Sequence, residues 1–223
     1  MNITPVFVRI GLAANASLLS CAIAAAPISP GDLVVSELMV NPAAVSDAAG
    51  EWIELYNTSA SSIDINGLVL RDNGSNHHTI STPAALEIAP GEFRVLGRNA
   101  DPGSNGGYLA DYAYRDFTLA NSSDAVILES EGVEIFRLSY SSADNFGQAG
   151  ISMALTQLLP GISAADYRAS ELQTVFGNGD RGSPGSGTIG SAQALAEVPL
   201  PATGLLFCSS LGLLAGIKRR RPA

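Results

Sequence analysis

The sequence predicts an all-β protein, an antiparallel β-sandwich flanked by N- and C-terminal hydrophobic helical segments. Short apolar runs alternate with Gly, Asn, Asp and Pro through the central part of the chain, a pattern typical of strands joined by tight turns. Only 15% of the 223 residues are charged, whereas 23 are glycine and 12 are proline. A helical bundle would need more Glu, Lys and Leu at helical spacing, and the central part does not sustain that spacing.

Seven central segments have the length and composition of strands. They are residues 33–39, 52–57, 63–70, 85–88, 93–97, 125–129 and 133–140. In the second segment Glu54 lies between Ile53 and Leu55. Either the two apolar residues face inward and Glu54 faces out, or the reverse, because successive side chains of a strand point to opposite faces. One short helix is expected within residues 164–175.

The central body is strongly acidic. All 21 acidic residues lie between the terminal segments, whereas Arg9 and residues 218–221 supply five of the 12 basic ones. The body therefore holds seven basic and 21 acidic residues, a formal charge of −14. Such a surface repels phosphate backbones, so no nucleic-acid partner is expected. Both cysteines, Cys21 and Cys208, lie in the terminal segments, so the body must be held together by its core.

Residues 1–26 are predicted to be a signal peptide. Arg9 precedes an uncharged apolar run over residues 10–26, and small residues close that run as they do before a cleavage site. The predicted cleavage region contains Ala22, Ala24 and Ala26. An uncleaved anchor is the alternative, but the run is short for a span of about 20 residues. A lipidated Cys21, following a lipobox-like Leu-Leu-Ser, is a second alternative.

The C-terminal region has three consecutive parts: a Gly/Ser/Ala-rich linker over residues 186–197, a short motif with an apolar run, and a basic cluster. The motif is Val198, Pro199, Leu200, Pro201 and Ala202, and the basic cluster is Lys218, Arg219, Arg220 and Arg221. Basic clusters stay on the cytoplasmic side while an apolar run enters the bilayer. A helix over residues 204–217 would rise about 21 Å, short of a ~30 Å hydrocarbon core, which suits a temporary hold.

The motif, the apolar run and the arginine cluster together resemble the PEP-CTERM sorting signal in its VPLPA form. Exosortases process this signal in Gram-negative bacteria that make extracellular polysaccharide. The resemblance implies an exosortase-type enzyme as a partner and a membrane-associated stage through residues 198–223, followed by the cell surface or extracellular matrix. Residues 200–204, Leu-Pro-Ala-Thr-Gly, also match the LPxTG signal of Gram-positive sortases, which is the alternative.

The body resembles the lamin-tail domain, an immunoglobulin-like β-sandwich also found in secreted bacterial proteins. The most specific match is Gly-Glu-Trp-Ile-Glu-Leu-Tyr-Asn at residues 50–57, and residues 34–42 and 179–185 are similar to the opening and closing segments of the family. The resemblance covers about residues 31–185, with 148–174 fitting poorly. It implies a lamin-tail-like domain over residues 27–185 but no particular reaction, because the fold is a scaffold.

No catalytic, cofactor-binding or metal-binding residue is predicted. His77 and His78 are adjacent, and Glu51 and Glu54 are three apart, so on a strand the members of each pair point to opposite faces. That is unsuited to joint metal ligation or to a glycosidase carboxylate pair. Glu51 and Glu54 are therefore interpreted as structural.

One sugar-binding candidate is present, formed by tyrosines with neighbouring aspartates. It comprises Tyr108, Tyr112, Tyr114, the loop 101–107 and residues 111–116. Tyrosines at alternating positions are more typical of a sandwich core.

The predicted function is therefore an exported bacterial cell-surface or extracellular-matrix protein, a non-enzymatic binding or structural module. Its partners would be extracellular polysaccharide or other surface proteins. The alternatives are a targeting or accessory subunit of a secreted hydrolase system, a sortase-anchored wall protein, and, last, a hydrolase in its own right.

Overall fold

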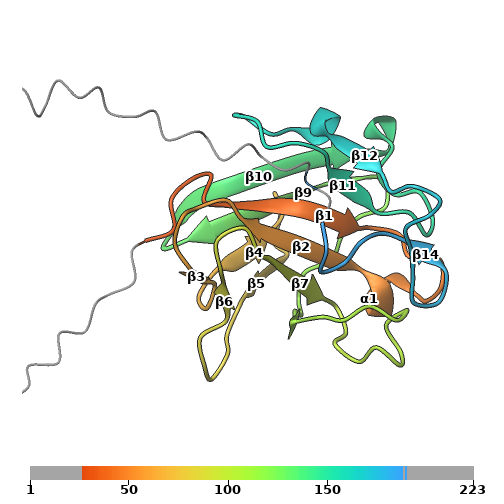
Figure 1. Cartoon of the computed structure of the whole chain (residues 1–223), viewed down its shortest axis with the longest axis horizontal. Helices are drawn as coiled ribbons and strands as arrows, with labels where there is room; N and C mark the ends of the chain where they lie inside the picture. Colours follow the sequence, from red (N-terminus) through yellow and green to blue (C-terminus); the bar gives the residue numbers. More distant parts are fainter. Residues whose placement is uncertain (1–26, 188, 190–223) are drawn as a thin grey trace, which may run out of the picture.

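The computed structural model describes residues 27–187 and residue 189, and these form two packed β-sheets (Figure 1). The larger sheet has the strand order β12-β11-β1-β2-β7-β8. Its strands are β1 (Leu33–Met39), β2 (Trp52–Asn57), β7 (Phe93–Gly97), β8 (Tyr112–Ala113), β11 (Met153–Leu155) and β12 (Tyr167–Ala169). All of its pairings are antiparallel except β7 with β8. The predicted all-β, antiparallel class is confirmed.

The second sheet has four antiparallel strands in the order β10-β9-β4-β5. Its strands are β4 (Val69–Arg71), β5 (His77–Thr79), β9 (Ser123–Ser130) and β10 (Val133–Ser141). Two small ladders pair β3 (Ile63–Asp64) with β6 (Glu87–Ile88), and β13 (Val175–Phe176) with β14 (Asp180–Arg181). The helical elements described are α1 (Asp47–Gly50) and the 3₁₀ turns η1 (Ser142–Asp144) and η2 (Ala164–Asp166).

The core lies between the inner faces of the two sheets. Leu38, Ile53 and Leu55 come from the larger sheet, and Leu128 and Leu138 from the smaller one, all fully buried in one apolar cluster. Burial of such side chains contributes about 1.5–3 kcal/mol each to folding. The sandwich is therefore held by ordinary hydrophobic packing, as expected for a body that contains no cysteine.

A β-bulge sets which side chains of β1 face the core. The pairing with β2 runs from Val35↔Leu55 directly to Glu37↔Glu54, which leaves Ser36 as the extra residue. A bulge of this kind shifts the alternation of side chains beyond it. As a result Val35 lies in the core cluster, while the Glu37 side chain is on the opposite, outer face of the sheet with its partner Glu54.

The structure corrects three details of the sequence prediction. The expected strand 63–70 is divided by a turn at Gly67, whose φ is +90°, so β3 and β4 pair with different strands. The helix expected within 164–175 is only the 3₁₀ turn η2, followed at once by β12. Glu54 does face away from the core, but it is fully buried instead of solvated.

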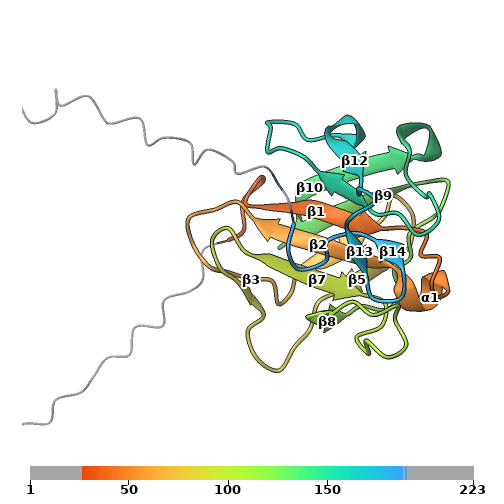
Figure 2. The same cartoon turned by 45° about the vertical axis from the view of Figure 1, so that its right-hand side comes forward.

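The burial of Glu54 is explained by the part of the chain that follows β10. Strands β11 and β12 extend the larger sheet beyond β1, and the following residues fold back over its outer face, in front of β1 and β2 in Figure 2. We call residues 180–187 the closing segment. Just before it, Phe176 packs on Trp52 with ring centroids 6.0 Å apart, and Trp52 also contacts Tyr108 at 6.1 Å. The larger sheet is thus covered on both faces.

Within residues 27–187 and 189, no helix is long and apolar enough to cross a membrane. The two hydrophobic segments predicted to be helical, 1–26 and 198–223, lie outside the described residues.

Gly97 provides a test of the outer packing. A Cβ placed on Gly97 would overlap the phenol of Tyr108, whose ring carbon Cε2 would be only 2.8 Å away. Because both residues are buried, the Gly97→Ala variant should lose about 1–3 kcal/mol of unfolding free energy through overpacking. Urea denaturation measures this loss. The control is Gly74→Ala in an exposed turn, where the closest atom would be 3.4 Å away. Equal stability of the two variants would contradict the described packing.

Candidate functional site

Two buried carboxylates lie side by side on the outer face of the larger sheet. Glu37 of β1 and Glu54 of β2 are paired in register, and each is 0% exposed. Buried carboxylates are destabilising unless hydrogen-bond donors replace the water that they lose. The hydrogen-bond donors to Glu37 and Glu54 therefore decide whether these carboxylates are structural or available to a ligand.

Glu37 accepts hydrogen bonds from three separate parts of the C-terminal region. Ser183 donates its backbone N–H at 2.9 Å and its hydroxyl at 2.6 Å. Ser170 donates its hydroxyl at 3.2 Å, and Ser152 donates its hydroxyl to the same carboxylate. Gly182 permits this close approach, because a Cβ there would lie 2.9 Å from the Glu37 carboxylate.

Glu54 has two donors, one from β1 and one from the closing segment. The Ser36 hydroxyl donates at 2.6 Å, and the Gly185 backbone N–H donates at 2.6 Å. Burial raises the pKa of Glu54 to about 7, partly opposed by the Ser36 hydrogen bond and reinforced by the charge of Glu37. These contacts attach the closing segment to the sheet and leave Glu54 with no approach to a ligand.

Glu51 has a separate environment at the start of β2. Its carboxylate accepts from the Leu119 backbone N–H at 3.3 Å and from Arg98 Nη1 at 3.2 Å. Burial raises the pKa of Glu51 to about 7 even though the Leu119 hydrogen bond and the charge of Arg98 oppose the shift. Glu51 and Glu54 thus have different partners, and each ties a distant loop to β2, as the sequence interpretation proposed.

The adjacent histidines of β5 also have different partners. His77 is exposed, with Nδ1 3.1 Å from the Ser75 carbonyl. His78 Nε2 lies 2.8 Å from Tyr112 Oη, and the Arg115 N–H donates to its Nδ1 at 3.3 Å. Burial lowers the pKa of His78, and the Arg115 contact fits an unprotonated Nδ1. His78 joins the two sheets. Among the described residues no group of three or more His, Cys, Asp or Glu could hold a metal ion.

The tyrosines of the sugar-binding candidate are mostly structural. Tyr108 and Tyr114 are 1% and 0% exposed and belong to the two apolar clusters. Tyr112 is half-buried and bonded to His78 and to the Ser81 N–H. Three rings that are buried or already bonded do not offer a stacking platform for a sugar.

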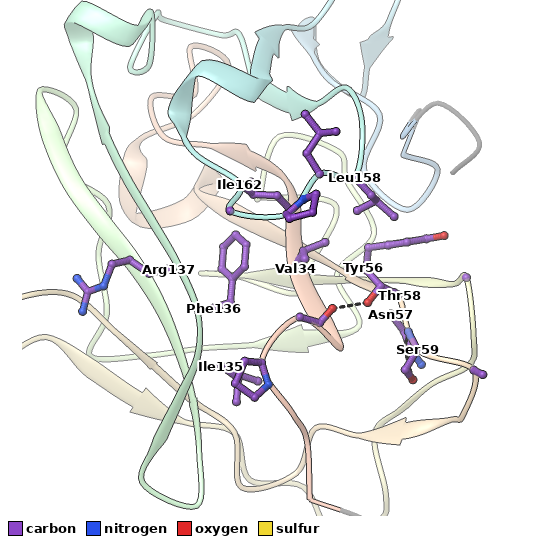
Figure 3. A pocket seen from close by; sticks show the side chains of 17 residues that line it. Val34, Tyr56, Asn57, Thr58, Ser59, Ile135, Phe136, Arg137, Leu158 and Ile162 are labelled. Carbon is purple, nitrogen blue, oxygen red and sulfur yellow. Dashed lines mark hydrogen bonds between the residues drawn. The ribbon is translucent and has the colours of Figure 1, made fainter. Parts of the chain in front are cut away.

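The described part of the chain also has an apolar groove of about 1080 Å³ (Figure 3). One wall is β10, where Phe136 points into the groove, and the facing wall is the loop 158–162 between β11 and β12. Val34 and Tyr56, from the paired ends of β1 and β2, complete it. The N-terminal part of the described chain closes one end, where Thr58 donates its hydroxyl to the Gly31 carbonyl.

This groove could not be predicted from the sequence, because it is lined by five separate segments, of which residues 30–34 and 158–162 are more than 100 residues apart along the chain. Glu37 was missed as a site residue because most of its hydrogen-bond donors are also more than 100 residues away. A lone Glu in the mostly apolar segment 33–39 was a usable signal of a satisfied buried carboxylate.

A family model, the lamin tail domain, matches residues 26–142, just over half of the chain. The chain belongs to the lamin tail domain family. The two antiparallel sheets fit the immunoglobulin-like sandwich that the resemblance implied. A comparison with curated proteins finds no match. The lamin tail domain match ends at residue 142, directly after β10, so β11, β12 and the closing segment lie beyond it. The Glu37 and Glu54 contacts therefore join the matched part of the domain to the part that follows.

The predicted processing residues lie outside the described residues. These are Ala22, Ala24 and Ala26, the sorting motif Val198–Ala202, and the basic cluster Lys218–Arg221. Their roles stay predictions, as do the boundaries of the domain, the linker and the sorting signal.

The raised pKa of Glu54 predicts a pH-dependent stability. A folded-state pKa of about 7 lies above the ordinary value of 4.5, so the contribution of this group is fully present below pH 4.5 and is lost as the pH rises through 7. The total loss is on the order of 3 kcal/mol. Glu51, whose pKa is also raised to about 7, contributes a similar decrease over the same range. Glu54→Gln should therefore reduce, by about half, the decrease in unfolding free energy between pH 5 and pH 8, measured by urea denaturation.

The matched control is Glu92→Gln, because Glu92 is exposed. This variant should keep the wild-type pH dependence. A Glu54→Gln variant with the same slope as the wild type would show that Glu54 is ionised well below pH 7 in the folded protein.

Proposed function

We propose that this lamin tail domain protein is an exported bacterial surface or extracellular-matrix protein, a non-enzymatic module delivered by an exosortase-type enzyme. The observation that carries the proposal is the order of the C-terminal parts. A folded domain is followed by a Gly/Ser/Ala-rich linker, then Val198–Ala202, an uncharged apolar run and the Lys218–Arg221 cluster. This order is that of a substrate held briefly in a membrane and then released or transferred.

The chemistry of the described domain is compatible with a non-enzymatic role. The buried carboxylates of the described domain, Glu37, Glu51, Glu54 and Asp180, and the partly buried His78 are groups that a hydrolytic site could use. Each is engaged in a contact between segments. The apolar groove is the place where the module would bind another molecule. Extracellular polysaccharide and other surface proteins are the expected partners, and the acidic body disfavours nucleic acid.

The alternative is a sortase substrate anchored to a Gram-positive wall. Residues 200–204, Leu-Pro-Ala-Thr-Gly, favour it specifically, because sortase signals have this form and are also followed by an apolar run and a basic cluster. The two enzymes would leave different C-termini, so one experiment separates them.

The test is the mass of the mature C-terminus of protein isolated from its own host. We expect loss of Lys218–Arg221 and a new end within Val198–Ala202. A Pro199→Ala, Pro201→Ala double variant should keep its full tail and stay in the membrane fraction. Pro184→Ala, a proline substitution outside the motif, should be processed normally.

Two other outcomes would overturn the exosortase assignment. A terminus at Thr203 joined to a peptidoglycan fragment would identify a sortase substrate. An intact end at Ala223 in the wild-type protein would leave a permanently membrane-anchored protein.

A further inference from the structure

The apolar groove differs in charge from the rest of the body. Of the 17 residues that line it, none is acidic, and the one charged residue, Arg137, is paired with Glu134 at 2.6 Å. Residues 27–187 as a whole hold seven basic and 20 acidic residues, a formal charge of −13. The walls of the groove present the side chains of Val34, Tyr56, Phe136 and Ile162. The groove therefore suits an uncharged apolar segment. Its volume of about 1080 Å³ is at the upper end of pockets for small ligands, which favours a short peptide.

The described chain ends beside this groove. Gly187 packs so closely on Phe93 that a Cβ would lie 2.5 Å from the ring. Phe93 in turn contacts Tyr56, with ring centroids 4.7 Å apart, and Tyr56 lines the groove. Ile189 packs against the same apolar cluster as Tyr56. The described chain therefore ends in contact with Phe93, which packs on Tyr56 in the wall of the groove.

We propose that the groove holds the Val198–Ala202 segment of the same chain before the chain is processed. This segment is uncharged, and its two prolines favour the extended polyproline conformation that binds in apolar, aromatic-lined grooves. The eight residues 190–197 reach at most about 26–29 Å, which is ample for a groove that adjoins Tyr56.

A weak affinity is sufficient for such a contact. A short flexible linker gives an effective concentration in the millimolar range, so an intrinsic Kd of about 100 μM would keep the segment bound about 90% of the time. The bound motif would be withheld from solvent until a processing enzyme competes for it. The withholding of the motif from a processing enzyme rests on the proposed sorting function, whereas the contact between the motif and the groove does not.

The test is disulfide trapping in the full-length chain, reconstituted at one chain per phosphatidylcholine nanodisc with both native cysteines replaced by serine. Leu159, 44% exposed, lies at the groove, and Thr203 directly follows the motif. With Leu159→Cys and Thr203→Cys together, we expect an intrachain disulfide to form in oxidised glutathione. It should form about tenfold faster than in the control pair Leu109→Cys and Thr203→Cys.

Leu109 is a strict control, because it is 77% exposed and lies outside the groove, in a second pocket that Ser186 of the closing segment also lines. Adding Leu200→Asp to the Leu159→Cys pair should reduce its rate to that of the control. Equal rates for the two cysteine positions, or no effect of Leu200→Asp, would overturn the proposal. Disulfides that form only between chains in samples without nanodiscs would assign the groove to a second copy. The mature C-terminal mass tests the proposed function independently of these results.

Discussion

The hydrogen bonding of Glu37 and Glu54 is the constraint on which the rest of this structure depends. Two adjacent, fully buried carboxylates on β1 and β2 are tolerated only if protein donors replace their water. Apart from Ser36, which donates to Glu54, the donors come from Ser152, Ser170 and the closing segment, more than 100 residues away from their acceptors. The outer face of the sheet therefore specifies where the last part of the domain must pack.

This constraint also fixes where the chain leaves the domain. The closing segment passes over Glu37 and then Glu54 before Gly187 reaches Phe93, close to the open apolar groove. A lamin tail domain with this addition has its C-terminal exit attached to the central strands of its larger sheet.

Local signals were sufficient for the central strands and insufficient for everything that depends on distant contacts. The bounds of β1, β2 and β7 were predicted correctly, because apolar alternation and flanking turn residues are properties of each segment alone. Strands β11 and β12, with three residues each, have no such pattern and exist because they pair with β1 and with each other. The burial of Glu54 was missed because its cover comes from residues 182–187. The groove was missed because it is formed by five separate segments.

The most direct test of the central claim is amide hydrogen exchange at Ser183 and Gly185 in the full-length chain. If their N–H groups are held by Glu37 and Glu54, both amides should exchange as slowly as those of β1 and β2, because they open only with the sheet. Exchange at the rate of an unstructured peptide, while β1 and β2 stay protected, would contradict the account. It would mean that the closing segment is not what satisfies the buried carboxylates.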